Sequence, residues 1–155
     1  MRIGALLLVA ALGCSGEETP AGRLFKGKPL EYWAVQLEDL DPKRSDEAVE
    51  ALVAFGPEAL PHLAAAFGDA KPSIAENAAR ALHGIACREP GEKGVAPAVV
   101  MAARSPSFHV RYWAARTLGE MRPPPPEARE TLLLLQEDPA ETVREMAKAK
   151  LRELR

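Results

Sequence analysis

Apolar residues recur along one stretch of the chain with the spacing of an amphipathic helix. In residues 110–121 the apolar positions are Val110, Ala114, Leu118 and Met121, spaced 4, 4 and 3 residues apart. This spacing places them on one face of a helix, and the polar residues between them lie on the other faces. The pattern therefore predicts a helix that buries one stripe.

The same stripe occurs three more times, which indicates an internal repeat. The steps between the central leucines are 30, 36 and 33 residues, in the series Leu52, Leu82, Leu118 and Leu151. Four residues before each leucine stands an alanine, in the series Ala48, Ala78, Ala114 and Ala147. A proline precedes each stripe at a similar period, in the series Pro42, Pro72, Pro106 and Pro139.

A shorter apolar run lies ahead of each of these prolines, so each unit is predicted to contain two helices joined by a turn. In the first unit the two helices are expected over 30–40 and 45–55. One helix pair cannot bury its apolar face alone, so neighbouring units must stack, and small alanines let their helices approach closely. The predicted fold class is all-α, an α-solenoid of about four antiparallel helix pairs.

The repeat resembles a known family. A period of 30–36 residues, Asp-Pro or Ser-Pro in the turn and a Val-Arg-x-x-Ala-x-x-x-Leu second helix resemble HEAT repeats, in particular the short HEAT-like repeats of phycobilin lyases. Val110-Arg111 and Val143-Arg144 match best, whereas Arg44 and Ile74-Ala75 depart from the pattern. The signatures of tetratricopeptide and ankyrin repeats are absent. The resemblance implies that second helices line the concave side and that Arg111 and Arg144 form a structural ladder to acidic turn residues.

The first residues have the pattern of an export signal. Arg2 precedes an apolar run of ten residues over 3–12, which is too short to span a bilayer. The sequence Ala-Leu-Gly-Cys at 11–14 resembles the lipobox of bacterial lipoproteins, although its Ala and Leu are not the usual residues there. The resemblance implies cleavage before Cys14 and attachment of lipid to it. An ordinary secretory signal and a misassigned start codon are the alternatives.

These segments predict the organisation of the chain. A lipoprotein signal peptide occupies 1–13, a flexible polar tether 14–27, and the HEAT-like repeat domain 28–155. The expected location is the bacterial cell envelope, with the membrane contacted through the N-terminal lipid anchor. The outer membrane is favoured over the inner one because Ser15, and not aspartate, follows the cysteine.

Charge and motifs narrow the function. The chain has 20 basic and 22 acidic residues, without the basic excess typical of nucleic-acid binding. His62, His83 and His109 fall in different units, and neither His-x-x-x-His nor Cys-x-x-Cys occurs, so no metal site is predicted. Phosphate loops and catalytic motifs are also missing, so we predict no catalytic residue, no cofactor and no enzyme activity. Cys87 is expected to be a half-buried, inert cysteine.

One group of side chains is typical of a protein interface. Tyr112, Trp113 and Arg116 lie together on one second helix, and aromatic residues and arginine are the usual anchors of interfaces. The alternative is that Trp113 packs between units. The sequence therefore predicts a membrane-anchored scaffold that binds a partner protein.

Two other functions are kept open. The lyase resemblance implies an accessory or lyase-like protein that acts on a chromophore or small ligand, and a purely structural envelope component is the third reading. A concave apolar pocket would favour the ligand-binding function, and a shallow charged surface would favour the scaffold.

Overall fold

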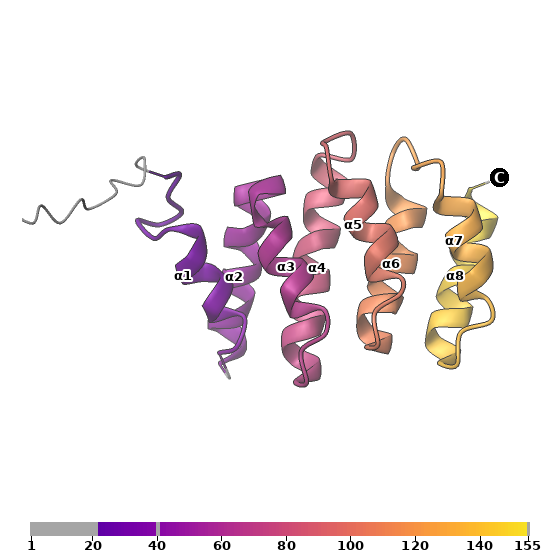
Figure 1. Cartoon of the computed structure of the whole chain (residues 1–155), viewed down its shortest axis with the longest axis horizontal. Coiled ribbons are helices and arrows are strands. Elements are labelled where there is room, and N and C mark those ends of the chain that lie inside the picture. The colour runs from indigo at the N-terminus through magenta and orange to yellow at the C-terminus, as the bar shows by residue number, and fades with distance from the viewer. Residues whose placement is uncertain (1–21, 40, 155) are drawn as a thin grey trace, which may run out of the picture.

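The computed structural model describes residues 22–39 and 41–154, and this part of the chain folds into a row of helix pairs (Figure 1). The elements are α1 (Leu30–Gln36), α2 (Pro42–Phe55), the 3-10 helix η1 (Gly56–Ala59), α3 (Leu60–Ala66), α4 (Pro72–Arg88), α5 (Val95–Ala102), α6 (Phe108–Glu120), α7 (Ala128–Leu135) and α8 (Glu141–Glu153). The predicted all-α solenoid of four helix pairs is confirmed. The predicted signal peptide and Cys14 lie outside the described residues.

The turn inside each pair is built in the same way. A short polar side chain accepts a hydrogen bond from the backbone N–H two residues later, at 2.8–3.1 Å, in the series Asp39, Asp69, Ser105 and Asp138. Such side chains offer the backbone a turn in place of a continued helix. Pro42 and Pro72 then open α2 and α4, where a missing N–H costs nothing.

The second helices form the tighter of the two layers. The four repeated leucines are at most 8% exposed, and the four repeated alanines at most 2%. Neighbours in the series α2, α4, α6 and α8 pack extensively on each other, whereas the first helices contact one another much less. The stripe predicted from the sequence is therefore the shared core between units.

The folded part begins earlier than predicted. Phe25 and Lys28 exchange backbone hydrogen bonds of 2.9 and 3.0 Å, and Trp33 Nε1 donates to the Phe25 carbonyl at 3.1 Å. Arg23 Nη1 also reaches the Phe55 carbonyl at 3.5 Å. The prediction that 14–27 is a flexible tether is therefore wrong at its C-terminal end. It failed because Leu24 and Phe25 are only a short apolar pair without a helical or strand period.

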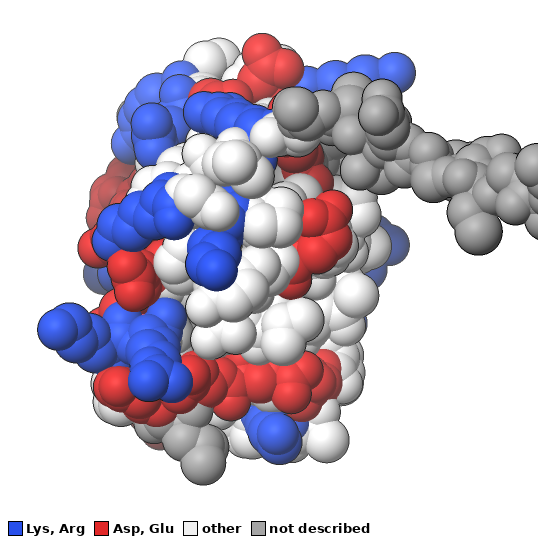
Figure 2. Space-filling view, turned by 90° about the vertical axis from the view of Figure 1, so that its left-hand side faces the viewer, with Lys and Arg blue, Asp and Glu red and all other residues white. Residues whose placement is uncertain are grey.

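At the N-terminal end of the described residues, α1 is the first helix of the row. Figure 2 shows an uncharged area in the middle of this end, with basic and acidic side chains around it. Leu24, Tyr32 and Val35 are 60%, 41% and 63% exposed. These apolar side chains on and before α1 are therefore largely in contact with solvent.

An arginine joins the turns of the last two units. Arg111 forms two parallel bonds with Asp138, Nε to Oδ2 at 2.7 Å and Nη2 to Oδ1 at 3.0 Å. Its Nη1 also donates to the carbonyls of Ser105 and Pro106, both at 2.9 Å. The predicted ladder is thus confirmed at Arg111. Arg144 donates to the corresponding carbonyls of its own turn, and within 22–39 and 41–154 it has no carboxylate partner.

The environment of Asp138 favours its charged form. Burial by itself would raise the pKa of this carboxyl group, but hydrogen bonds from Arg111 and from the Ala140 N–H hold the pKa below its ordinary value. Bidentate arginine–carboxylate pairs are among the strongest polar contacts in proteins. The ion pair therefore fixes the register between the third and fourth units.

The position of Leu118 gives a test of the core. Leu118 is 0% exposed at the centre of α6, so Leu118→Ala should lower the free energy of unfolding by about 2–5 kcal/mol. Urea denaturation measures this loss. Leu134, which is 66% exposed on α7, is the matched control, and Leu134→Ala should change stability by less than about 0.5 kcal/mol. Equal losses in the two variants would mean that the stripe is not the core.

The Arg111–Asp138 pair predicts a pH dependence. Because the pKa of Asp138 is lower in the folded chain than in the unfolded one, its contribution is complete above about pH 4 and is lost as the pH falls through the folded value. Asp138→Asn should therefore cost about 3 kcal/mol at pH 7, and the difference from the parent chain should shrink below about pH 4.

Denaturation curves between about pH 2 and pH 7 check this dependence. The matched control is Glu145→Gln, which removes an ion pair with Lys148 that is exposed to solvent, and this variant should behave almost like the parent chain. A deficit in Asp138→Asn that stays constant across the whole pH range would contradict the role of the charged carboxylate.

Candidate functional site on the second-helix layer

Polar and aromatic side chains from three second helices meet at one place in the tighter layer. We call this group the α4–α6–α8 cluster, and its members are His83, Cys87, Trp113, Arg116, Glu120 and Lys150. On each helix these residues are three, four or seven positions apart, so they share one face. The stacking of α4, α6 and α8 then brings the three faces together.

The three predicted interface residues lie in contact with one another. The rings of Tyr112 and Trp113 meet edge to face with their centroids 6.1 Å apart, and the guanidinium of Arg116 lies 5.0 Å from the Trp113 ring centroid. All three side chains are half-buried. The Trp113 ring also lies 5.3 Å from the ring of His83 on α4 and packs against the core. Trp113 therefore packs between units, as the alternative reading expected, while part of it stays exposed.

Glu120 is the centre of the charged contacts. Its Oε1 accepts from Arg116 Nε at 3.1 Å and pairs with Lys150 Nζ at 3.0 Å, and its Oε2 lies 3.4 Å from His83 Nε2. Burial would raise the pKa of Glu120, but the hydrogen bonds from Lys150 and Arg116 lower it below the ordinary value. The carboxylate is therefore charged at neutral pH.

A glycine makes room for the third helix. A Cβ at Gly119 would collide with the side chain of Lys150, which crosses this position on its way to Glu120. The lysine side chain is only 11% exposed, and it also pairs with Glu153 at 3.0 Å. The absence of a side chain at Gly119 therefore lets α8 supply a cation to a carboxylate of α6.

The hydrogen bonds of His83 decide which of its nitrogens carries the proton. Thr117 Oγ1 donates to the Trp113 carbonyl at 2.6 Å, so its single proton is used there. His83 Nδ1 lies 3.1 Å from the same oxygen and must be the donor of that bond. Burial, as the main cause, lowers the pKa of His83, so the ring is neutral at pH 7. Nε2 therefore presents a lone pair on the side of Glu120.

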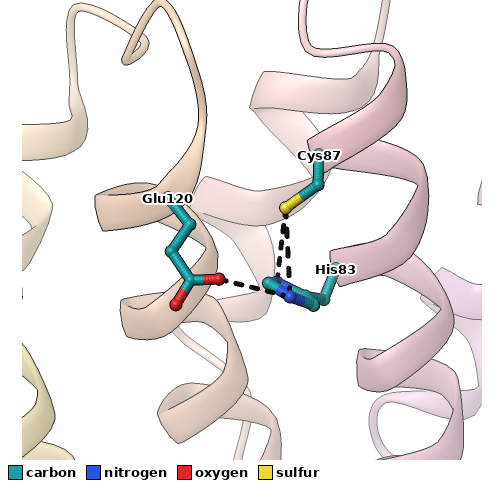
Figure 3. Close-up of side chains that lie close together, drawn as sticks. All are labelled: His83, Cys87 and Glu120. Carbon is teal, nitrogen blue, oxygen red and sulfur yellow. Dashed lines mark hydrogen bonds and ion pairs between the residues drawn. The ribbon is translucent and has the colours of Figure 1, made fainter.

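Cys87 completes the group, one helical turn after His83 (Figure 3). Its Sγ lies 3.9 Å from His83 Nε2 and 3.8 Å from Nδ1. The residue is exposed, not half-buried as predicted, because it stands at the end of α4 beside a polar loop. Burial of the sulfur, which is turned toward His83, raises the pKa of the thiol. A protonated thiol is a weak nucleophile, in agreement with the low reactivity that was expected.

Three ligand types known from metal proteins thus lie together. One donor atom each from His83, Cys87 and Glu120 falls within 4.8 Å of the others. The sequence contains neither His-x-x-x-His nor Cys-x-x-Cys, and for that reason no metal site is predicted from it. A mixed His-x-x-x-Cys pair on a helix was the signal that could have been found. The third ligand, 33 residues after Cys87, depends on how the units stack and carries no sequence signal.

The hollows in the described surface differ in their linings, and one of about 300 Å³ beside α5 is lined largely by the apolar Pro97, Val100 and Met101. Another of about 530 Å³ lies along α7 and α8, and all but one of its lining side chains are polar, namely Gln136, Glu137, Arg144, Lys148, Leu151 and Arg152. A chromophore would instead need a largely apolar cleft with a few converging polar groups. Within the described residues, the helices are all too short or too polar to cross a membrane.

The arrangement of the chain is shared with known repeat proteins. It resembles a chain from the complex of CpcE and CpcF of phycocyanin lyase from Nostoc sp. PCC7120, with 25% identity, a TM-score of 0.63, and coverage of 81% of this chain and 77% of that one. Computationally designed armadillo repeat proteins for modular peptide recognition match at 20% identity and a TM-score of 0.53, over 84% of this chain and 66% of theirs.

A further designed armadillo repeat protein matches at 22% identity and a TM-score of 0.50, over 84% of this chain and 66% of that one. No curated protein gives a significant match. The family described as HEAT repeats matches residues 76–152, which contain α5, α6 and α7 and most of α4 and α8. The described chain is therefore an α-solenoid whose residues 76–152 match the HEAT-repeat family.

Proposed function

We propose that this protein is a membrane-anchored HEAT-repeat scaffold of the bacterial envelope that binds a partner protein through the α4–α6–α8 cluster. The observation that carries the proposal is the half-buried Trp113, held between His83 and Arg116 on the tighter helix layer. A large aromatic side chain whose orientation is already fixed loses little entropy when a partner covers it, and such residues dominate interface energies.

The charges around Trp113 also suit a protein partner. Arg116 and Lys150 both pair with Glu120. Lys150 also pairs with Glu153, so that the two positive and two negative charges balance. The surface therefore favours neither a strongly acidic nor a strongly basic partner. Polar atoms beside Tyr112 and Trp113 can form hydrogen bonds with the partner. This is the composition of a typical interface, with an aromatic centre and a polar rim.

An accessory or lyase-like role on a chromophore is the second candidate, and a structural envelope component is the third. The likeness to the phycocyanin lyase complex, at 25% identity, favours the second candidate. The polar lining of the hollow along α7 and α8 favours the scaffold over a ligand pocket. The same likeness is to a chain that works in a two-protein complex, which also agrees with a protein partner.

The interface can be tested at Trp113. A partner is first recovered with the tagged full chain from detergent-solubilised membranes, and its affinity is then measured with purified proteins. Trp113→Ala should weaken binding by about 2 kcal/mol or more, which is about thirtyfold in Kd, because the anchor of the interface is lost. Arg116→Ala should weaken it in the same direction.

Two controls separate binding from folding. Tyr32→Ala removes a 41% exposed tyrosine of α1, far along the row from the cluster, and should leave the affinity unchanged. The melting temperature of each variant is followed by circular dichroism. If Trp113→Ala collapses the fold, Trp113 is a packing residue, and the Arg116→Ala measurement then decides. Unchanged affinity in both folded variants would place the interface elsewhere.

The lipid anchor is tested at Cys14, which lies outside the described residues. The parent chain should be cut before Cys14 and should carry lipid on it, whereas Cys14→Ser should stay uncut and leave the membrane fraction. Two or three acyl chains anchor a protein stably where one does not. Mass spectrometry of the mature N-terminus measures the change, with Cys87→Ser as the matched cysteine control. An unmodified Cys14 with Met1 still attached would exclude the lipoprotein.

A further inference from the structure

We propose that His83, Cys87 and Glu120 form a binding site for a divalent transition-metal ion, with Zn²⁺ as the ion best suited to the three donors. This site goes beyond the scaffold function, and it joins the second unit of the array to the third. Imidazole nitrogen, thiolate sulfur and carboxylate oxygen are the ligands that zinc takes in proteins, and three protein ligands leave a fourth position for water.

The distances between the donor atoms come close to those of a tetrahedral site. Zinc bonds of about 2.0–2.3 Å at tetrahedral angles place neighbouring donors about 3.4–3.7 Å apart. The separation of His83 Nε2 and Glu120 Oε2 is 3.4 Å, and that of His83 Nε2 and Cys87 Sγ is 3.9 Å. The sulfur and the carboxylate, within 4.8 Å, need a small side-chain movement, and Cys87 is exposed and free to make it.

The histidine is already oriented as a ligand. Thr117 Oγ1 accepts from His83 Nδ1, and this leaves the Nε2 lone pair on the side of Glu120 Oε2. The Cys87 sulfur lies beside the ring. A ligating histidine in a metal site almost always donates its other N–H to a fixed acceptor, which sets the ring and the tautomer. Thr117 is 1% exposed, so the acceptor is held rigidly. Here Thr117 is a positioning residue.

The two oxygens of the Glu120 carboxylate have different neighbours, and one of them is available to a metal ion. Arg116 and Lys150 both contact Oε1, whereas Oε2 faces the histidine. His83 Nε2 and Glu120 Oε2 lie 3.4 Å apart, so both atoms are within reach of one ion. The Cys87 thiol would lose its proton to solvent on binding. The ion and its two anionic ligands would then be neutral together.

Stacking alone does not require these polar side chains. Between α2 and α4, Val53 and Gly84 occupy the positions that His83 and Glu120 occupy between α4 and α6. The first residue of each pair stands one position after the repeated leucine of its helix, and the second stands two positions after it. There the valine side chain packs directly over the glycine. An apolar contact therefore serves the same structural purpose, and the polar donors between the second and third units have a different role.

The test uses the full chain with Cys14→Ser, which leaves Cys87 as its single thiol. Co²⁺ is the spectroscopic probe, because a thiolate ligand gives it a charge-transfer band, and Zn²⁺ affinity is measured by competition with Co²⁺. We expect one ion per chain and a thiolate band that is lost in Cys87→Ser. Zn²⁺ affinity should fall at least tenfold in His83→Gln and in Glu120→Gln, and Thr117→Val should weaken it about 10–100-fold.

The matched control is another histidine–carboxylate pair between the same two helices. His109 Nδ1 lies 3.6 Å from Glu76 Oε2 but has no cysteine beside it, so His109→Gln should keep the cobalt band and the Zn²⁺ affinity. Zn²⁺ affinity that is unchanged in folded Cys87→Ser or His83→Gln would overturn the site. The site would also be overturned if the folded parent chain with Co²⁺ showed no thiolate charge-transfer band.

Discussion

The close approach of the second helices is the constraint on which the rest of the structure depends. Each unit places an alanine four residues before its central leucine, and the alanines are at most 2% exposed between neighbouring helices. A larger side chain there would push the units apart and uncover the leucines. Because stability in a repeat array comes from contacts between neighbours, this spacing sets both the core and the geometry of the exposed rim of the layer.

The same register explains how a histidine–carboxylate pair replaces an apolar contact between α4 and α6. The position after the leucine and the one beyond it meet across neighbouring units, as Val53 with Gly84 and as His83 with Glu120. Between α6 and α8, the absence of a side chain at Gly119 makes room for the side chain of Lys150. Three residues that differ from their counterparts in the preceding unit, His83, Glu120 and Lys150, thus replace an apolar contact with a histidine–carboxylate pair and a lysine beside it.

The sequence predicted most of the fold because a period of leucine and alanine determines which helix faces are buried, and the Val-Arg pattern pointed correctly to the Arg111 ladder. The sequence did not predict the contacts that form only when the chain has folded. Phe25 has no periodic neighbours, yet its carbonyl holds the Trp33 indole. The three interface residues could be placed together because they share one helix turn, whereas Glu120 joined His83 and Cys87 only through the stacking of α4 and α6.

His83 connects the two proposals physically. Its ring lies against Trp113, and Nδ1 bonds to Thr117. Nε2 faces Glu120, and the Cys87 sulfur lies beside the ring. A ligated imidazole cannot turn, so an ion at Nε2 would also fix the ring surface on which the indole rests. The same ion would tie α4 to α6 at the place where the indole is exposed. Metal binding would therefore lower the entropy cost of presenting Trp113 to a partner, without adding a contact of its own.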